Sequence, residues 1–521
     1  MQRHECDVVV IGGGATGVGV LRDAAMRGHR AILIERADLA QGTTGRHHGL
    51  LHSGGRYVCS DPGSARECAR ENAILTRIHA DAVEATGGLF VATPDDDPAY
   101  GDRFAVAAAA TRVLATELSP AAALRREPRL NPAISRAFEV ADGSIDGWAM
   151  VWGAVNSARE YGGRVLTYHQ VTGFEVADGL IRAVHCLDRR GDPVIVDTRF
   201  VINAAGAWAG QIAELAGCGD VEVVPGRGIM IAMAHRLVNT VINRLAPPDD
   251  GDILVPVHTV SIIGTTDVYA TDPDHLPIPA DEVQQLLDDG ERLIPGFRQA
   301  RALRAWAGAR PLIRDTRVVA ADTRHMSRGM ALMDHRGRDG MRGLLTIAGG
   351  KLTTYRLMAE RAVDAMESQL GERRPCRTAT EPVPGAIPGR TYAVTRRLAD
   401  RESDRLSDQI VCECELLARR QVEAALAADP QASLDDLRRR LRLGMGPCQG
   451  GFCGYRAAGI AGRGADDLIE FIEHRWIGLW PILYGDQLRQ AALDEWLWQG
   501  LLGIELLPGE SAGWKPAVGN G

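Results

Sequence analysis

Short apolar runs, separated by glycine-rich turns and helix-like segments, mark three stretches of the chain. The first is CDVVVI at 6–11, which leads into a glycine-rich turn, a helix-like segment and a second apolar run, AILI. The other two lie at 199–210 and 343–366, where an apolar run also enters small residues. Such runs bounded by glycine are typical of buried parallel strands, so the pattern predicts one α/β sheet to which the chain returns twice.

The segments between those returns predict a second domain. Residues 164–176 and 257–269 favour strands, so we expect this domain to contain a mixed sheet. A segment rich in Pro, Gly and Thr then precedes the C-terminal part and is typical of a linker. The predicted divisions are a discontinuous first domain (about 1–70, 195–215 and 330–370), both domains together within 1–370, a linker at 371–400 and a C-terminal part at 401–521.

Size and charge narrow the possible functions. The 521 residues exceed what one hydrophobic core usually organises, and the formal net charge of -8 argues against a nucleic-acid partner. The basic run RRRLR at 438–442 fits a solvated helix face. No apolar run approaches the ~20 residues of a membrane span, and the N-terminus lacks a secretory signal. We therefore expect a cytoplasmic protein whose ten cysteines are thiols or ligands.

The first glycine-rich turn has the spacing of a dinucleotide-binding site. Gly12, Gly14 and Gly17 occupy the G-x-G-x-x-G positions between a predicted strand and a predicted helix. This spacing permits the tight turn, admits a pyrophosphate to the helix N-terminus and lets helix and strand pack closely. Glu35 ends the second strand, where its carboxylate can accept hydrogen bonds from ribose hydroxyls.

The discontinuous sheet favours FAD over NAD as the bound nucleotide. A nicotinamide cofactor enters and leaves on each turnover, whereas FAD remains buried between two domains. The helix predicted after the double glycine at 349–350 could direct its N-terminus at the flavin and stabilise the charge gained on reduction. The other candidate cofactor-binding residues are Thr43, Thr44, Gly45, Ala205, Gly206, Gly349, Gly350, Lys351, Leu352 and Thr353.

Several motifs together resemble FAD-dependent glycerol-3-phosphate dehydrogenases, most closely the catalytic polypeptide of the anaerobic, multi-subunit bacterial enzyme. They include GGGATGVGVLRDAAMRG, GTTGRHHGLLHSGGRY, DILVP, IGTTD, GARPL, SRGMALMDH and GGKLTTYRLMAE, in the family's order. The resemblance implies a glutathione-reductase-like FAD-binding domain and a D-amino-acid-oxidase-type substrate domain. It also implies oxidation of sn-glycerol 3-phosphate to dihydroxyacetone phosphate.

The same resemblance implies partners. They are a second subunit, together with a membrane-associated iron–sulfur subunit that feeds quinone. Because the chain has no predicted span of its own, it would attach peripherally to the inner face of the membrane through them.

Cations in these motifs are the candidates for binding a substrate phosphate, which favours several positive charges and the bidentate fork of arginine. We predict Arg310 and Arg328 as the phosphate-binding pair, with Arg56, Tyr57 and Lys351 as further members of the pocket. Arg310 and Lys351 are also predicted to act in catalysis.

A base must accept the substrate's hydroxyl proton, and His52 is the first candidate. The alternative that His52 only packs against or hydrogen-bonds the flavin remains open, and His258 is a weaker second candidate. One departure from the family pattern is Arg227, which stands before Gly228 where a lysine is expected. A guanidinium differs from an ammonium in geometry, so the substrate is less certain than the cofactor.

Four cysteines cluster near the C-terminus, as Cys412 and Cys414, then Cys448 and Cys453 in the turn GMGPCQGGFC. Four thiolates can hold a [2Fe–2S] cluster, and zinc is the alternative, although Cys-x-Cys is tight for a structural zinc site. The segment is similar to the bacterioferritin-associated-ferredoxin-like domain that ends this type of polypeptide. We predict a small, mostly helical, Cys-rich domain followed by a Trp-rich tail, which either completes a core or meets a partner.

Two other functions fit parts of this pattern. The first is an FAD-dependent amino-acid or 2-hydroxy-acid dehydrogenase of the same fold, although a carboxylate needs only one arginine fork rather than four cations. The second is a non-catalytic electron-transfer protein, which would leave the substrate-side cations without a role.

Overall fold

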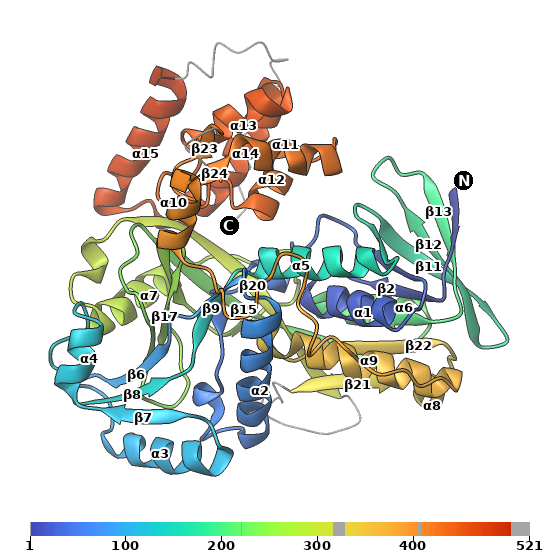
Figure 1. Ribbon diagram of the computed structural model, residues 1–521, viewed down its shortest axis with the longest axis horizontal. Coiled ribbons are helices and arrows are strands. Elements are labelled where there is room, and N and C mark those ends of the chain that lie inside the picture. Colours follow the sequence, from blue (N-terminus) through green and yellow to red (C-terminus); the bar gives the residue numbers. More distant parts are fainter. Residues whose placement is uncertain (1, 220, 316–328, 404–407, 502–521) are drawn as a thin grey trace. The chain divides into compact units, whose positions relative to one another are not determined.

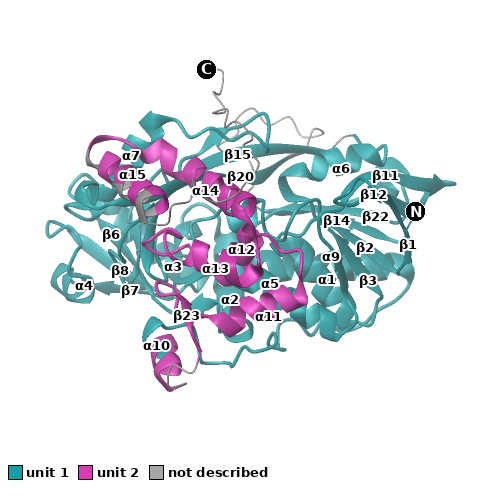
Figure 2. Ribbon diagram, turned by 90° about the horizontal axis from the view of Figure 1, so that it is seen from above, with its two compact units in different colours: residues 1–396 teal, residues 397–521 magenta. Residues whose placement is uncertain are grey.

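The computed structural model describes residues 2–219, 221–315, 329–403 and 408–501, and it divides into two compact units. Unit 1 spans Met1–Arg396 and unit 2 spans Arg397–Gly521 (Figure 2).

A six-stranded sheet forms the centre of the first half of unit 1 (Figure 1). All its strands are parallel except β21, which runs antiparallel to β22. Its strand order is β10 (Arg164–Leu166), β3 (Ala31–Ile34), β2 (Val8–Ile11), β14 (Val201–Asn203), β22 (Leu344–Gly349) and β21 (Met330–Asp334).

Both faces of this sheet are covered, which explains its nearly continuous apolar strands. Val8 and Val10 pack into the helical layer, whereas Val9 and Ile11 alternate onto the opposite face. The helical layer is α1 (Ala15–Met26), α5 (Gly147–Glu160) and α9 (Tyr355–Leu370). The opposite layer is α6 (Ala209–Leu215) and a sheet of β1 (Gln2–Glu5), β13 (Pro193–Asp197), β12 (Leu180–Leu187) and β11 (Gln170–Ala177).

The expected position of residues 164–176 in the second domain is wrong. The stretch divides at 167, and β10 pairs in parallel with β3 at the edge of the six-stranded sheet. The following strand, β11, joins the small sheet that covers the same domain. The apolar pattern identified strands correctly but carried no information about which distant strands they pair with.

The second half of unit 1 is built on a mixed sheet of nine strands, as expected from residues 257–269. The path is β19 (Val268–Tyr269), β15 (Val221–Met233), β18 (Val260–Gly264), β17 (Ile253–Val257), β16 (Val241–Arg244), β6 (Gly88–Ala92), β8 (Arg136–Val140) and β7 (Ala115–Leu118), and β20 (Ala302–Asp315) also pairs with β15. Its helices are α2 (Pro62–Ile78), α3 (Ala99–Thr111), α4 (Pro120–Arg126) and α7 (Ala280–Leu293).

A small sheet connects the two halves of unit 1. It pairs β4 (Leu50–Leu51), β9 (Gly143–Ile145) and β5 (Val83–Glu84), so the segment after the first nucleotide motif is anchored beside the second domain.

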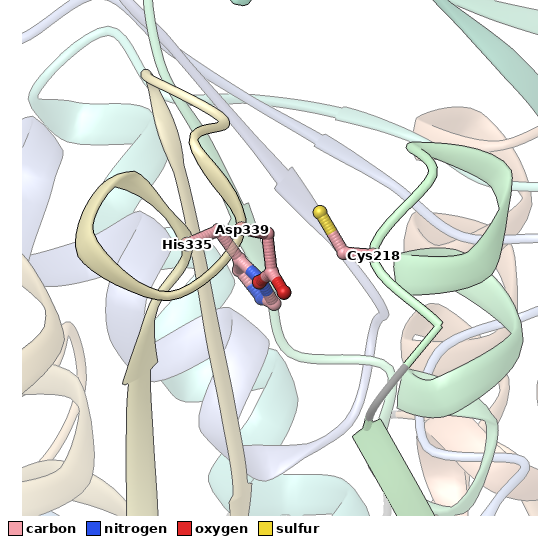
Figure 3. Close-up of side chains that lie close together, drawn as sticks. All are labelled: Cys218, His335 and Asp339. Carbon is pink, nitrogen blue, oxygen red and sulfur yellow. The ribbon is translucent and has the colours of Figure 1, made fainter.

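A buried histidine fixes the short helix α8 (His335–Asp339) to the six-stranded sheet (Figure 3). The Nδ1 of His335 lies 2.5 Å from Asp339 Oδ2, and its Nε2 lies 2.8 Å from Thr346 Oγ1. Cys218 approaches them from the loop after α6, and one ligand atom from each of Cys218, His335 and Asp339 lies within 4.8 Å of the others. Both ring nitrogens have partners and burial raises the pKa of the Cys218 thiol to about 11, so we assign this group a packing role.

The predicted linker lies along unit 1 for most of its length. The amide of Val383 donates to Ile78 O at 3.0 Å, and Arg22, which is 1% exposed, donates to Glu381 O at 2.5 Å. The amide of Tyr392 donates to Val83 O at 2.8 Å. The next helix, α10 (Val394–Ser403), begins beside the boundary between the units. The composition of this segment predicted irregular backbone, but it did not predict that the segment packs along unit 1.

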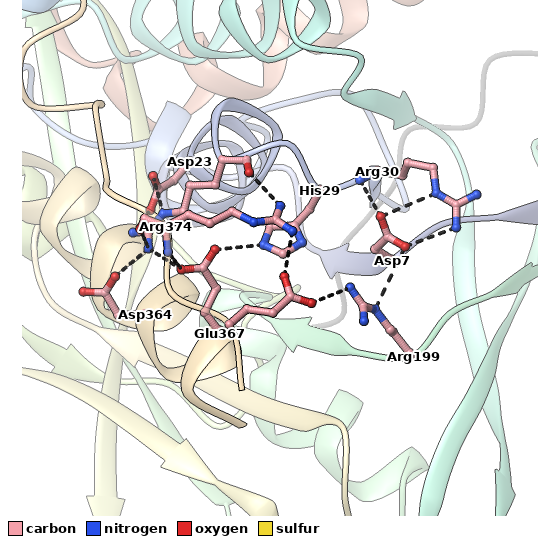
Figure 4. Close-up of polar contacts among 10 residues, drawn as sticks. Asp7, Asp23, His29, Arg30, Arg199, Asp364, Glu367 and Arg374 are labelled. Carbon is pink, nitrogen blue, oxygen red and sulfur yellow. Dashed lines mark hydrogen bonds and ion pairs between the residues drawn. The ribbon is translucent and has the colours of Figure 1, made fainter. Parts of the chain in front are cut away.

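A buried ionic network ties this segment to α1 and α9 (Figure 4). Arg27 reaches Asp23 at 2.7 Å, Asp364 at 2.7 Å and Glu367 at 3.0 Å. Glu367 also lies 3.0 Å from His29 Nε2. Burial alone would raise the pKa of Glu367, but the Arg374 amide, His29 and Arg27 outweigh it and hold the pKa below its usual range.

Replacing Glu367 by glutamine is expected to lower the free energy of unfolding by about 3 kcal/mol, because Arg27, His29 and the Arg374 amide lose the buried carboxylate that they share. A carboxylate with a lowered pKa stabilises the fold above its unfolded pKa, and this stabilisation is lost as the pH falls through the folded pKa. The variant should lose that acid-side dependence. Urea titration across pH measures both effects, and Glu5→Gln, which removes an exposed partner of Arg30, is the control with a change under about 1 kcal/mol.

Unit 2 is mostly helical. Its core is made by residues such as Val411, Leu437 and Phe471, and it includes Cys412 and Cys453. Its elements are β23 (Ile410–Cys412), β24 (Leu417–Ala418), α11 (Arg419–Ala428), α12 (Leu434–Leu441), α13 (Cys453–Ala461), α14 (Ala465–Leu479), α15 (Leu488–Glu495) and a π-helical turn at Trp496–Leu501.

The tryptophans of the tail divide into two groups. Trp498 packs against the core of unit 2, whereas Trp476, Trp480 and Trp496 are 40%, 67% and 73% exposed. Trp514 lies outside the described residues.

Candidate functional sites

Unit 1 contains a cavity of about 1060 Å³ between its two halves. Its volume lies at the upper end of the range for small-molecule sites, as a dinucleotide with a small substrate would require. Gly17, Gly45 and Thr353 are absent from its lining, and Arg328 lies outside the described residues. The predicted residues that line it are Gly12, Gly14, Glu35, Thr43, Thr44, His52, Arg56, Tyr57, Ala205, Gly206, Arg310, Gly349, Gly350, Lys351 and Leu352.

The glycine-rich turn forms one end of the cavity. Gly12 has φ of +109°, and a Cβ there would lie 2.7 Å from Ala204 O. A Cβ on Gly17 would lie 1.8 Å from Gly12 O, so Gly17 serves the packing of α1 on β2 rather than the lining. α1 begins at Ala15 without an acidic residue in its first turn, which leaves its positive end available to a pyrophosphate. These residues fit an FAD phosphate site.

Glu35 lies beside that turn and already has backbone partners. Its carboxylate accepts from Gly13 N at 2.6 Å and from Ala37 N at 2.9 Å. Burial raises the pKa of Glu35, although these two hydrogen bonds oppose the rise. The remaining lone pairs can still accept from ribose hydroxyls, so Glu35 can both hold the turn and bind the nucleotide.

The segment at 43–45 lies across the N-terminus of α1. Thr44 Oγ1 accepts from Ala15 N at 2.9 Å, and Thr43 Oγ1 donates to Ala309 O at 2.5 Å. A Cβ on Gly45 would lie 2.1 Å from Ala40 O, which explains a glycine at a position behind the lining. This segment therefore links the nucleotide end of the cavity to strand β20.

The double glycine forms the other end of the cofactor site. Gly349 and Gly350 have φ of +79° and +68°, and they lead into a 3₁₀ turn and then α9. Thr353 Oγ1 accepts from His52 N at 3.1 Å, so Thr353 supports the lining from behind. α9 also lacks an acidic residue in its first turn, as the flavin end requires if charge is to develop there.

Three of the predicted cations line the same cavity, and each has a partner in the protein. Arg56 Nη1 lies 2.6 Å from Asp252 Oδ2, and Arg310 Nη1 lies 2.9 Å from Asp267 Oδ1. Lys351 Nζ donates to Ser64 Oγ at 2.9 Å and lies 4.5 Å from the centre of the Tyr57 ring. These partners orient the cations, and a phosphate would have to compete with the carboxylates for two of them.

A further carboxyl group lies close to Arg310 in the same cavity. Burial, together with Asp249 and Asp267, raises the pKa of Asp250 to about 6, and Asp250 lines the cavity. Its negative charge is therefore lost only as the pH falls to about 6, and near neutral pH most of that charge still lies close to Arg310.

Two other residues singled out in the sequence lie away from the cavity lining. The ring of His258 stacks on Tyr392 at 3.9 Å, so its candidacy as the base is not supported. Arg227 is 4% exposed, pairs with Glu282 and donates to Pro277 O at 2.8 Å. It fastens β15 to the start of α7, so the exchange of lysine for arginine affects packing rather than the cavity.

Arg46, His47 and His48 also line the cavity, although their sequence pattern did not identify them as candidates. Their signal was the polar run RHHG between the predicted cofactor residues at 43–45 and the strand that carries His52. A polar run between two site motifs is itself evidence of a lining segment.

The four clustered cysteines of unit 2 are free thiols whose side chains contact one another in a row. Cys412 meets Cys453, Cys453 meets Cys448, and Cys448 meets Cys414. Hydrogen bonds from neighbouring thiols lower the pKa of Cys412 and lower that of Cys448 to about 2, which favours thiolates there.

Two features of this cysteine cluster fit an iron–sulfur site. Backbone amides of Gly444 and Glu415 face Cys412, and those of Gly450 and Phe452 face Cys448, as donors to cluster sulfurs should. Across the described residues, no three of these sulfurs lie within 4.8 Å of one another. A single tetrahedral zinc would draw all four closer than this, because its Zn–S bonds are only ~2.3 Å long.

Comparison with known proteins identifies the family. The family model for FAD-dependent oxidoreductases matches residues 7–356. The A subunit of the anaerobic glycerol-3-phosphate dehydrogenase of Escherichia coli strain K12 is 42% identical over 96% of this chain and 97% of its own. The A1 subunit of the Haloferax volcanii enzyme is 38% identical over 94% of this chain and 89% of its own. This chain belongs to the family of FAD-dependent oxidoreductases.

Solved structures agree on the fold. The glycerol-3-phosphate dehydrogenase from Bacillus halodurans, complexed with FAD, superposes with a TM-score of 0.65 at 20% identity and covers 90% of this chain and 93% of its own. Glycine oxidase from Bacillus cereus gives a TM-score of 0.55 over 70% of this chain and 95% of its own. Membership of this family gives FAD as the cofactor of the protein. No helix in the described part of the chain is both long and apolar enough to cross a membrane.

Proposed function

We propose that this protein oxidises sn-glycerol 3-phosphate to dihydroxyacetone phosphate. The observation that carries the proposal is that Arg56, Arg310 and Lys351, from three separate segments, line one cavity. A carboxylate substrate would need one arginine fork, whereas a phosphate dianion favours several cations. The relatives named as glycerol-3-phosphate dehydrogenases support the same substrate.

Different residues of the cavity have different roles in the proposed reaction. Arg310 and Arg56, with Arg328, hold the phosphate, and Lys351 holds the substrate close to the Tyr57 ring. FAD, when bound, would supply the acceptor for the hydride that leaves C2. His52 accepts the proton of the C2 hydroxyl, so the C2–O bond becomes a carbonyl. The hydrogen bond from the His52 amide to Thr353 Oγ1 holds the segment around His52 beside the double-glycine turn.

The electrons leave through unit 2 in this proposal. Cys412, Cys414, Cys448 and Cys453 would hold a [2Fe–2S] cluster, and such a cluster would supply one-electron transfer beside a two-electron donor. Residues 401–521 would then form the electron-transfer domain. The relatives are named as one component of a larger enzyme, which supports an assembly with other polypeptides. We infer a second subunit, together with a membrane-associated iron–sulfur subunit, with quinone as the final acceptor and peripheral attachment on the cytoplasmic side.

Arg310→Ala is expected to remove about 2 to 5 kcal/mol of transition-state stabilisation for glycerol 3-phosphate, which lowers kcat/KM roughly 30- to 5,000-fold, because a desolvated charge partner is lost. Activity on glycerol, which lacks the phosphate, should change far less. Arg298→Ala removes an arginine that pairs with Asp288 away from the cavity lining and should leave both activities unchanged. An unaltered preference between the two substrates in Arg310→Ala would mean that other cations bind the phosphate.

A further inference from the structure

The segment from Thr44 to Arg56 follows the length of the cavity. Thr44 receives the Ala15 amide at the nucleotide end, at 2.9 Å. The His52 amide meets Thr353 at the double-glycine end, and Arg56 lies among the phosphate-site cations. His48 lies between these contacts along the chain, and its charged neighbours include Arg56 and Arg310, so it belongs to the cation end of the cavity, where a flavin ring would lie.

One hydrogen bond fixes the tautomer of His48. The amide of Leu50 donates to its Nδ1 at 3.1 Å, so Nδ1 carries no proton. Burial, then the nearby His52, His47, Arg56 and Arg310, hold the pKa of His48 well below its usual range. The ring is therefore neutral at physiological pH, and its single proton is on Nε2.

The Nε2–H group of His48 is a hydrogen-bond donor. No acceptor for it lies within the described residues. The His48 ring lines the cavity, and it lies edge-on to the His52 ring with 6.2 Å between centroids. A donor that the protein itself leaves unpaired in a cofactor cavity is a candidate partner for the cofactor.

We propose that His48 donates its Nε2–H hydrogen bond to a nitrogen or carbonyl oxygen of the FAD ring and thereby favours the reduced cofactor. A hydrogen bond to an acceptor that gains negative charge is roughly twice as strong as a neutral one. The bond therefore strengthens when the ring accepts a hydride, and the midpoint potential rises. FAD is the cofactor of the family to which this chain belongs, so the proposal does not depend on the identity of the substrate.

This role separates His48 from the base. A general base needs a lone pair directed at the proton it removes, and the only lone pair of His48 faces the Leu50 amide. His48 keeps its proton throughout the reaction, whereas His52 is the residue proposed to accept one. His48 is thus a catalytic residue of a different kind, acting by contact with the cofactor.

His47 supplies a matched control on the same segment. The Gly49 amide donates to its Nδ1 at 3.0 Å, and burial lowers its pKa to about 4. Its electrostatic neighbour is Asp146 rather than the cations, and its Nε2 lies against Gly147 at the start of α5. His47 and His48 therefore have the same tautomer. The Nε2–H group of His47 faces the start of α5, whereas that of His48 is the group proposed to face the cofactor.

The test compares full-length, FAD-loaded His48→Leu, His48→Gln and His47→Leu with the parent protein. Anaerobic titration with dithionite and a reference dye, followed at the visible flavin band, gives each midpoint potential. His48→Leu should shift the balance of oxidised to reduced FAD about tenfold towards the oxidised form, or ~30 mV for two electrons. His48→Gln, which keeps an N–H donor, should recover most of the shift, and His47→Leu should show none.

Three outcomes would overturn the proposal. They are an unchanged potential in His48→Leu with FAD bound, an equal shift in His47→Leu, and no recovery in His48→Gln. If His48→Leu loses the cofactor, His48→Phe keeps the ring volume and must show the same lowered potential. Loss of FAD from all three His48 variants would show that the imidazole packs rather than donates.

Discussion

Replacing Gly14 by valine is expected to give a folded protein that holds no FAD. A Cβ at Gly14 would meet only Thr44 Oγ1, at 3.2 Å, so the protein itself has room for a side chain after a small adjustment. The pyrophosphate does not, because it must approach the backbone amides at the start of α1. The loss should exceed 1,000-fold in FAD affinity, or about 4 kcal/mol.

The measurement is the FAD content of purified protein by its visible spectrum, together with circular dichroism to confirm folding. Gly173→Val is the matched control, because a Cβ there would have no atom within 4 Å. Gly17→Val would not serve, since its side chain would overlap Gly12 O and damage the fold. Stoichiometric FAD in a folded Gly14→Val protein would place the phosphates elsewhere.

Local sequence determined much of the nucleotide site. The turn at 12–17 needs glycine for reasons that lie within a few residues, namely a positive φ at Gly12 and the contact between Gly17 and Gly12 O. The alternation of Val8 to Ile11 between two cores follows from strand geometry alone. These features could be predicted because they depend on neighbours in the chain.

Pairing between distant segments could not be predicted in the same way. The stretch that begins with β10 reads as a strand, yet its partner β3 lies about 130 residues away. His258 and Arg227 lie in apolar or motif segments, which suggested that they would line the cavity. Instead His258 stacks on Tyr392 and Arg227 pairs with Glu282, away from the lining. Residue type predicted their chemistry, whereas tertiary contacts set their location.

For His48, the sequence predicted the type of side chain but not its role. Its imidazole is chemically versatile in sequence, and only the Leu50 amide assigns it a tautomer and so a single role. The sequence contained the signal in RHHG, but the hydrogen bond that interprets it depends on the backbone conformation.

Replacing Cys448 by serine is expected to remove the proposed iron–sulfur cluster and leave the FAD site intact. Cys448 contacts both Cys414 and Cys453, so its loss breaks the arrangement at its centre. The cysteines and the FAD cavity belong to different compact units, and each unit has its own core. Substrate should still bleach the flavin in a single turnover.

Electron delivery to quinone through the partner subunits should then fall on the order of 100-fold, as expected when a metal site is disrupted. Iron and labile sulfide analysis, with stopped-flow bleaching and quinone reduction, measures the three effects separately. Cys59→Ser, at an exposed cysteine of unit 1, is the control that should change none of them. Stoichiometric zinc without iron in the parent protein would contradict the relay. Unit 2 would then be structural, because zinc carries no electrons between the flavin and a partner.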